Sequence, residues 1–188
     1  PLIWFWRALL GNPDALAKEA DSLRKHKDYY YGYRGLPKED FNLIKEELRN
    51  EKEYSLQNAA KFYALNRSSF SGATLSGGWS KRASYERFTD SSITRVREFN
   101  QPKLYVSAQH FKHSIPAHPK TFLYLDPPYL LGKDKENLYG DAGNKHKGFD
   151  HAGLVNILKE RDNWILSYNN CPEILKLYEG YDIIYPDW

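Results

Sequence analysis

The sequence has little of several features that would place a protein in a narrow class. It contains one cysteine, Cys171, and no methionine, which excludes an internal disulfide framework and any metal site built on several cysteines. We therefore expect Cys171 to be a small buried side chain in a reducing compartment. The longest apolar run, residues 2–10 interrupted by Arg7, is far shorter than the roughly 20 residues that cross a bilayer. No segment has the pattern of a signal peptide, so we expect a cytoplasmic protein without membrane association.

The composition is that of a globular protein. Hydrophobic residues make up 41% of the 188 positions and aromatic residues 15%, values that exclude collagen-like, low-complexity and disordered chains. This length suits one domain, or one domain with an insertion. The net charge of +3 is too small to identify a partner, but it is unevenly distributed, because residues 61–120 hold ten Lys or Arg against three Asp or Glu.

The two ends of the sequence suggest a piece of a longer protein. The chain begins at Pro1 directly in an apolar, aromatic segment, and it stops at Trp188 without a polar tail. We expect a fragment.

The N-terminal third has helical periodicity. Apolar residues at steps of three and four predict a helix over residues 2–10. A second helix is predicted through about residue 27, with Asn12 as its cap and Pro13 in its first position. Further helices are predicted over 37–50 and 55–65. Residues 68–92 contain ten Ser or Thr and three glycines, so loops and short hairpins are predicted there rather than packed helix.

The C-terminal third alternates between strand and helix patterns. Strands are predicted over 121–125, 164–168 and 181–185, and helices over 149–160 and 172–178. This alternation is typical of a parallel sheet with helices on its faces, and the fold class is therefore α/β.

The tetrapeptide Asp126-Pro127-Pro128-Tyr129 follows the first of these strands, the position at which α/β sheets bind their ligands. The two prolines have no N–H donor and a fixed φ, so the loop is a rigid set of acceptors. The Asp126 carboxylate and the Pro127 carbonyl can together hold the two hydrogens of an exocyclic amino group, and Tyr129 offers a face on which a base stacks. The alternative is a rigid turn with no further role.

These residues resemble the Dam-like, D12 class of adenine-specific DNA methyltransferases. Other segments similar to that family are Tyr63-Ala64-Leu65-Asn66-Arg67 with Phe70 and Gly72, residues 108–111 and residues 164–170. The resemblance implies a Rossmann-like sheet with a helical, loop-rich DNA-recognition insertion, and methyl transfer from S-adenosylmethionine to adenine N6 in duplex DNA after base flipping. It also implies a catalytic loop of Asp126, Pro127, Pro128 and Tyr129, with Asp126 near the cofactor.

The glycine-rich cofactor loop of that family is expected before Pro1. Gly77-Gly78 does not replace it, since no predicted strand precedes it, and we interpret it as a turn. The fragment alone is therefore expected to bind S-adenosylmethionine poorly and to be inactive. The organisation we predict is a helical segment over 1–65, a basic target-recognition region over 66–119 and a catalytic α/β portion over 120–188.

The basic middle region predicts contact with DNA phosphates or bases. The candidate residues are Asn66, Arg67, Lys81, Arg82, Arg87, Arg95 and Arg97. The alternative for each arginine is a solvated surface side chain, and for Asn66 it is the cap of a turn. His110, His113 and His118 lack acidic or cysteine companions at metal-ligand spacing, so no metal is predicted. We expect a monomer whose partner is duplex DNA.

Three alternatives stay open at this point. One is a DNA-binding module without activity of its own, and another is an RNA guanine-amino methyltransferase with a similar loop. The third is a structural α/β domain. The polar segment 132–148 after the motif is a candidate for a loop that closes over the base.

Overall fold

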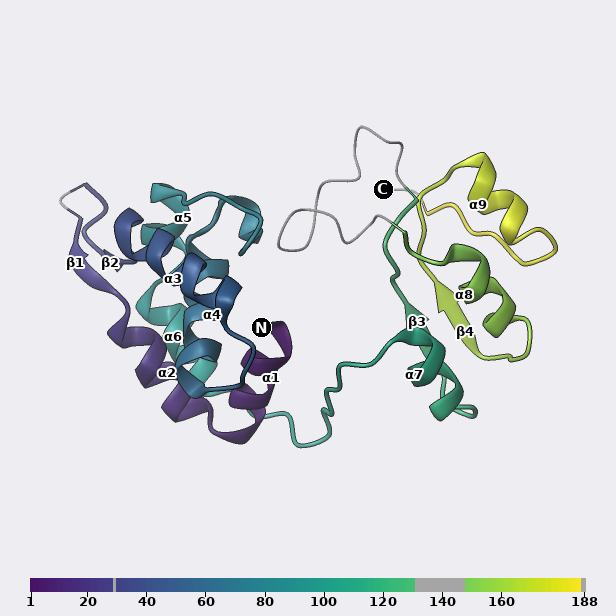
Figure 1. The fold of residues 1–188 in the computed structure, drawn as a ribbon, viewed down its shortest axis with the longest axis horizontal. Coiled ribbons are helices and arrows are strands. Elements are labelled where there is room, and N and C mark those ends of the chain that lie inside the picture. The colour runs from purple at the N-terminus through teal and green to yellow at the C-terminus, as the bar shows by residue number, and fades with distance from the viewer. Residues whose placement is uncertain (29, 131–147, 187–188) are drawn as a thin grey trace. The chain divides into compact units, whose positions relative to one another are not determined.

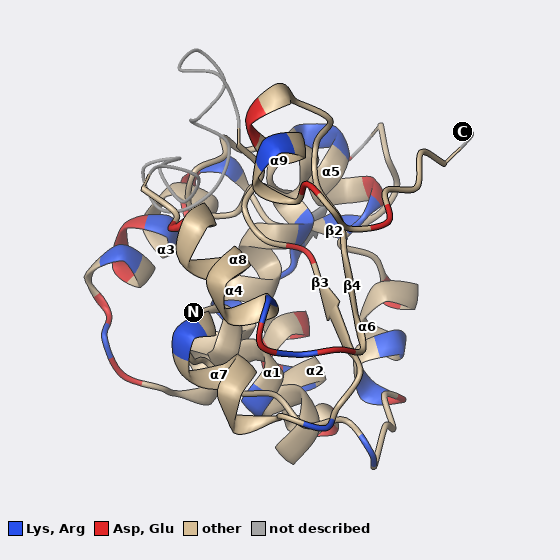
Figure 2. Cartoon of the chain, turned by 90° about the vertical axis from the view of Figure 1, so that its right-hand side faces the viewer, with Lys and Arg blue, Asp and Glu red and all other residues tan. Residues whose placement is uncertain are grey.

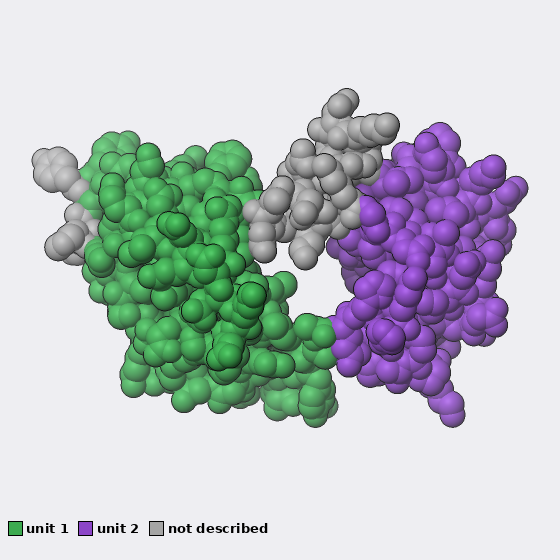
Figure 3. Space-filling model, viewed as in Figure 1, with its two compact units in different colours: residues 1–108, 140–142 green, residues 109–139, 143–188 purple. Residues whose placement is uncertain are grey.

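The structure, a computed structural model, describes residues 1–28, 30–130 and 148–186 (Figure 1). The described chain forms two compact units, the first comprising Pro1–Ala108 and the second beginning at Gln109 (Figure 3). Each unit is described by itself. The predicted segment 132–148 lies, apart from Gly148, outside the described residues.

The first unit begins with four helices at nearly the predicted positions. They are α1 (Leu2–Gly11), α2 (Pro13–Ser22), α3 (Lys38–Asn50) and α4 (Leu56–Ser68). The predicted cap Asn12 is present, because its side chain accepts a hydrogen bond from the Ala15 amide at 3.0 Å. Ser55, the first residue of the predicted segment 55–65, caps α4 in the same way by accepting from the Asn58 amide at 3.0 Å. Local sequence signals therefore define where these helices begin.

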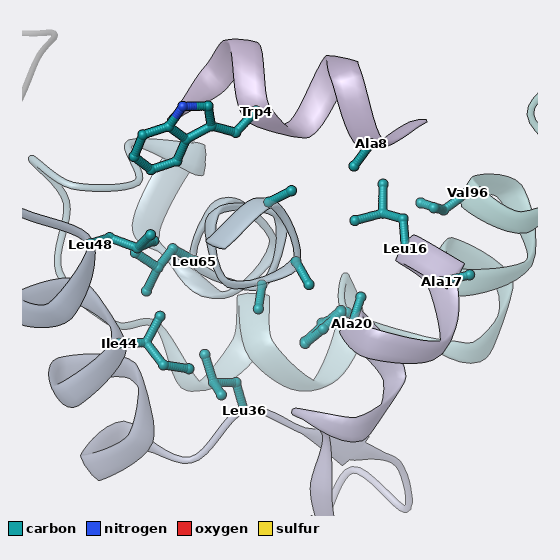
Figure 4. Packing of buried hydrophobic residues seen from close by; sticks show 14 of the residues in the cluster. Trp4, Ala8, Leu16, Ala17, Ala20, Leu36, Ile44, Leu48, Leu65 and Val96 are labelled. Carbon is teal, nitrogen blue, oxygen red and sulfur yellow. The ribbon is translucent and has the colours of Figure 1, made fainter. Parts of the chain in front are cut away.

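Helix α4 is the centre of this unit. Its residues Ala59, Ala60, Ala64 and Leu65 are fully buried, and α1, α2, α3 and α5 all pack against it. Figure 4 shows side chains of the surrounding helices pointing inward around a helix seen end-on. Small alanine side chains let the neighbouring helices approach closely, so the apolar core forms around one buried helix.

The predicted helix over 13–27 is too long. After α2 the chain forms β1 (Lys25–Lys27), which pairs antiparallel with β2 (Arg34–Gly35). The Asp28 carboxylate accepts hydrogen bonds from the amides of Tyr30 and Tyr31 and so stabilises the turn between the strands. A local turn and strand pairing end the helix earlier than its pattern suggested.

The prediction of loops and hairpins over 68–92 is wrong in its second half. Residues 69–80 do form a short 3₁₀ helix, turns and a bridge between Ser69 and Trp79. Two helices follow, α5 (Lys81–Glu86) and α6 (Asp90–Arg97). Ser80 and Thr89 cap them, so the serine and the threonine at these positions begin helices instead of interrupting them. Ile93 and Val96 of α6 belong to the core, and Ala83 and Tyr85 of α5 are buried.

A buried cation joins α2 to α6. The Arg24 side chain is 1% exposed, and its Nη1 lies 2.8 Å from Asp21 Oδ1 and 2.6 Å from Asp90 Oδ1. Its guanidinium also lies over the Phe88 ring, 5.8 Å from the centroid. Asp21 is further bound by Arg34 at 2.9 Å. Because a buried guanidinium must be paired, this cluster fixes the two helices and the β1–β2 hairpin to one another.

The second unit contains a small parallel sheet with helices on one face. Its elements are α7 (Phe111–Ala117), β3 (Leu123–Leu125), α8 (His151–Leu158), β4 (Trp164–Leu166) and α9 (Pro172–Leu177). Strands β3 and β4 are parallel, with Leu123 opposite Trp164 and Leu125 opposite Leu166. Leucines of α8 and Ile174 of α9 pack on the face that these four strand side chains form. Side chains along a strand alternate between the two faces, so the residues between them lie on the opposite face.

The other face of the sheet is open within the described residues. Tyr124 and Ile165 are paired across the strands and are 69% and 56% exposed. The third predicted strand, over 181–185, is not formed in the described chain. Tyr181 instead packs on Trp164, with ring centroids 5.2 Å apart, and Ile184 is exposed. A strand-like sequence pattern does not by itself produce a strand, because a strand also needs a neighbouring strand with which to form backbone hydrogen bonds.

The architecture is a mixed helix and strand fold that is compatible with an α/β methyltransferase. Two paired parallel strands do not amount to a Rossmann-like sheet, and that part of the predicted fold class is not confirmed. Among the described residues no helix is long and apolar enough to cross a membrane. The predicted division of function between residues 1–65, 66–119 and 120–188 stays a prediction.

The Arg24 cluster generates a stability prediction. Arg24→Met keeps most of the side-chain volume but removes two charge-assisted hydrogen bonds. We expect the free energy of unfolding of the first unit to fall by about 1–3 kcal/mol, measured by thermal or urea unfolding followed by circular dichroism. The matched control is Lys18→Met, which breaks an exposed ion pair with Asp14 on the same helix and should change stability by less than about 0.5 kcal/mol. Equal losses of stability in the two variants would contradict the role of Arg24 in fixing α2, α6 and the β1–β2 hairpin to one another.

Candidate active site

The Asp126–Tyr129 loop begins where the backbone ladder of the sheet ends. The last backbone hydrogen bond between the strands runs from the Ser167 amide to the Leu125 carbonyl, at 2.9 Å. Pro127 and Pro128 have no N–H, so the chain after β3 cannot continue the ladder. Asp126 is exposed, and the next three residues are half-buried. The acidic side chain thus lies at the carboxyl end of a parallel strand and is accessible to solvent.

Two side chains that follow β4 hold the end of this loop. The Tyr129 hydroxyl lies 2.9 Å from Ser167 Oγ. The Asn169 carboxamide binds both backbone groups of Leu130: its Oδ1 accepts from the Leu130 amide at 3.1 Å and its Nδ2 donates to the Leu130 carbonyl at 2.8 Å. The Tyr129 side chain is therefore fixed at two points: Ser167 binds its hydroxyl, and Asn169 binds the backbone of the next residue, Leu130.

Aromatic side chains support the loop from the helical side. The Tyr168 ring centroid is 6.1 Å from that of Tyr129, and the Tyr168 hydroxyl lies 2.5 Å from His151 Nδ1. Burial raises the pKa of Tyr168 far above its ordinary value, so this phenol is neutral at physiological pH. Asp150, next to His151, caps α8 through the Gly153 amide. Its pKa is lowered, chiefly by the hydrogen bond from Lys112 and then by that amide.

Two of the predicted DNA-contacting residues bind loop carbonyls of the protein itself. Arg67 donates through Nε and Nη2 to the Arg87 carbonyl, at 2.9 and 2.7 Å, and Asn66 Nδ2 donates to the Gly72 carbonyl at 3.0 Å. Burial lowers the pKa of Arg67, with the charges of Arg87 and Arg95 acting in the same direction. The side chains of Arg67 and Asn66 therefore hold the loops between α4 and α6 in place.

The other five predicted DNA contacts divide into two groups. Exposed ion pairs join Lys81 to Asp28, Arg82 to Glu86 and Arg97 to Asp14. Such pairs contribute roughly 0–1 kcal/mol and exchange readily for other partners. Arg87 and Arg95 have no side-chain ion pair or hydrogen bond within the described residues. Figure 2 shows basic and acidic stretches close together along the chain.

Arg95 and Arg67 lie at the edge of a shallow cavity of the first unit. The cavity has a volume of about 250 Å³. Its walls are mostly aromatic and come from α1, α4 and the segment from α6 onward: Phe5, Trp6, Leu9, Tyr63, Ser92, Val96 and Phe99. Arg67 is bound to the Arg87 carbonyl, whereas Arg95 has no side-chain ion pair among the described residues, so the positive charge beside this aromatic surface suits an anionic partner with flat apolar groups.

The pair Gly77-Gly78 lies in a loop: the Gly77 amide closes a turn that begins at Thr74, and the Gly78 carbonyl accepts from the Phe70 amide. The turn belongs to the loop closed by the Ser69–Trp79 bridge, and Lys45 Nζ donates to the Gly77 carbonyl at 2.5 Å. No strand leads into this loop within the first unit's described chain, so it lacks the strand-to-helix geometry of a cofactor loop. Cys171 is half-buried next to α9, less buried than expected. Across the described chain, no three His, Cys, Asp or Glu residues gather as metal ligands would.

An exposed acidic residue thus stands at the end of a parallel strand, followed by two prolines and an anchored tyrosine, in a mixed helix and strand fold. The comparison with family models is more specific. The D12 class N6 adenine-specific DNA methyltransferase family matches residues 1–188, the whole sequence, and the chain belongs to this family. No curated protein matches it.

The sequence analysis missed two residues of the site, Ser167 and Asn169. Both lie in the segment 164–170, which was noted only for its resemblance to the family. Their spacing of two residues after a strand was an available signal, since side chains two apart in extended chain point to the same side. Without the structure, nothing indicated that this side faces Tyr129 and Leu130.

The hydrogen bonds of Arg67 generate a second stability prediction. Arg67→Ala leaves the half-buried Arg87 carbonyl without its two donors, so the free energy of unfolding should fall by about 1.5–3 kcal/mol. The measurement is chemical unfolding monitored by circular dichroism. Arg95→Ala, an exposed arginine nearby, is the control and should shift stability by less than about 0.5 kcal/mol. A stable Arg67→Ala protein would show that this arginine is free to serve another partner.

Proposed function

We propose that this chain carries the substrate-binding loop and DNA-contacting surface of an enzyme that methylates N6 of adenine in duplex DNA, with S-adenosylmethionine as methyl donor. The observation that carries the proposal is the Asp126–Tyr129 loop, exposed at the end of β3 and anchored by Ser167 and Asn169, in a member of an adenine-specific DNA methyltransferase family.

The loop supplies what an amino group needs in order to be methylated. The lone pair of adenine N6 is delocalised into the purine ring, which makes the nitrogen a poor nucleophile. Acceptance of its two hydrogens by the Asp126 carboxylate and the Pro127 carbonyl would pull the nitrogen toward tetrahedral geometry and localise the lone pair. Because Pro127 and Pro128 have no N–H, no neighbouring amide competes for these oxygens.

Tyr129 would hold the flipped base by stacking. Base extrusion costs a few kcal/mol, and stacking on an aromatic side chain returns about 1–3 kcal/mol per base. A ring whose hydroxyl and adjoining backbone are already bound loses little further conformational entropy when the base arrives. Its anchoring by Ser167 and Asn169 supports this role.

The negative charge of the loop fits one part of the cofactor. The exposed Asp126 carboxylate is suited to the cationic methionine portion of S-adenosylmethionine, which supplies an electrophilic methyl group when bound. Within the described residues the only Gly-Gly turn is committed to the first unit's own loop. The remaining cofactor contacts are therefore assigned to no residue here.

The first unit would bind the DNA backbone. Arg87 and Arg95 have no competing partner among the described residues, and the exposed pairs of Lys81, Arg82 and Arg97 can exchange an acidic side chain for a phosphate. Asn66 and Arg67 would contribute by holding the loops that carry these cations. The monomeric state and the cytoplasmic location stay predictions.

The central test is loss of Asp126. In the gene product at its natural length, Asp126→Ala should lower kcat/KM for transfer of labelled methyl to unmethylated duplex DNA by at least about 100-fold, the scale of losing a key electrostatic contact. Asp162→Ala, which removes another exposed acidic residue of the second unit, is the control and should retain full activity. Undiminished transfer by Asp126→Ala would contradict the catalytic role of Asp126. Methylation of guanine in RNA instead of adenine in DNA would favour the alternative of an RNA guanine-amino methyltransferase.

A separate test addresses DNA binding by the chain as it stands. Its affinity for duplex DNA should fall linearly with the logarithm of salt concentration, and Arg87→Gln and Arg95→Gln should each reduce that slope by about 1. Lys52→Gln removes the same charge from an exposed site outside the basic region and should leave the slope unchanged. Binding without activity in the full-length enzyme would favour the binding-module alternative, whereas affinity that ignores salt would rule out the phosphate contacts.

A further inference from the structure

Beyond the ends of β3 and β4, the two chain segments are joined by hydrogen bonds from side chains instead of backbone hydrogen bonds. The ladder ends at the bond from the Ser167 amide to the Leu125 carbonyl. Two prolines and Tyr129 then follow, and beyond them both backbone groups of Leu130 are hydrogen-bonded again. Both are taken by the single carboxamide of Asn169, at 3.1 and 2.8 Å.

The orientation of this carboxamide is determined by its partners. The Leu130 amide can only donate, so the atom that faces it must be the Asn169 oxygen. The Leu130 carbonyl can only accept, so it must face the nitrogen. One side chain therefore presents a donor and an acceptor to the same residue, much as the edge of a neighbouring strand does.

We propose that Asn169 is a positioning residue of the methyltransferase site, which sets the Asp126–Tyr129 loop by extending the β3–β4 pairing past the two prolines through its bonds to Leu130. This inference rests on the proposed function. It adds a residue that touches neither the base nor the methyl group and acts through the loop that does.

The physical argument concerns what the loop would do without this clamp. The loop is fixed to the sheet at Leu125 on one side of the prolines and at Leu130 on the other. The Tyr129–Ser167 bond and the contact with the Tyr168 ring act on the Tyr129 side chain, whereas the bonds of Asn169 act on the backbone itself. If the Leu130 end is released, the carbonyl of Pro127 and the ring of Tyr129 sample several directions, and misplacement by about 1 Å can cost a hundredfold in rate.

The experiment compares three variants of the full-length enzyme: Asn169→Ala, Asn169→Asp and Asn156→Ala. Aspartate keeps an oxygen for the Leu130 amide but turns a second, negatively charged oxygen toward the Leu130 carbonyl, so it replaces one attraction by a repulsion. Asn156 is an exposed asparagine on α8 of the same unit and serves as the matched control. The single-turnover rate of methyl transfer, the DNA dissociation constant and the amide exchange of Leu130 are measured for each.

We expect Asn169→Ala to slow single-turnover transfer by about 10- to 100-fold with an unchanged DNA dissociation constant, and to accelerate Leu130 amide exchange by about tenfold. Asn169→Asp should also slow transfer by about tenfold or more, because its second oxygen repels the Leu130 carbonyl, and it covers the case in which the alanine variant does not fold. Asn156→Ala should match the parent.

Two results would overturn the positioning role. In one, Leu130 exchange is unchanged in Asn169→Ala, so the clamp is absent in solution. In the other, exchange accelerates while the transfer rate stays at the parental value, so the clamp is only structural. Failure of the proposed function is distinguishable from both, since the parent enzyme would then transfer no methyl group to DNA.

Discussion

Two consecutive prolines after β3 are the constraint on which the candidate site depends. They remove two backbone donors at the point where the sheet would otherwise continue to pair, so neither proline has an amide that competes for the carbonyl oxygens of the loop. The same removal takes away two possible backbone bonds to the neighbouring strand. Ser167 and Asn169 compensate with side-chain bonds to Tyr129 and Leu130, so the loop stays attached to the sheet.

The first unit attaches its loops with cationic side chains. Its loops between α4 and α6 expose backbone carbonyls that no strand or helix satisfies, and long basic side chains reach them: Lys45 binds the Gly77 carbonyl, Arg49 that of Leu75 and Arg67 that of Arg87. Of these three cations only Arg67 belongs to the positive segment 61–120. Its charge holds one of the protein's own loops, so a high count of Lys and Arg in a segment does not by itself measure the charge on its surface.

The sequence was most informative where the signal is local. Asn12, Pro13 and Ser55 begin helices through their own side chains or ring geometry, so these boundaries could be predicted. The strand at 181–185 could not be decided locally, because strand formation requires a neighbour that the pattern does not identify. Arg67 looked like a surface cation because its carbonyl partner lies 20 residues away in the sequence. Asn169 was overlooked for the same reason, as its partner Leu130 is 39 residues away.

The open face of the sheet also affects how the second unit behaves in concentrated solution. Within the described chain each of β3 and β4 has one partner, so each presents an outer edge with unpaired backbone groups beside the apolar side chains of Tyr124 and Ile165. Exposed edges of this kind recruit further strands from other molecules. Expression of this unit by itself consequently favours intermolecular sheet growth, and a charged residue in place of Ile165 would oppose it.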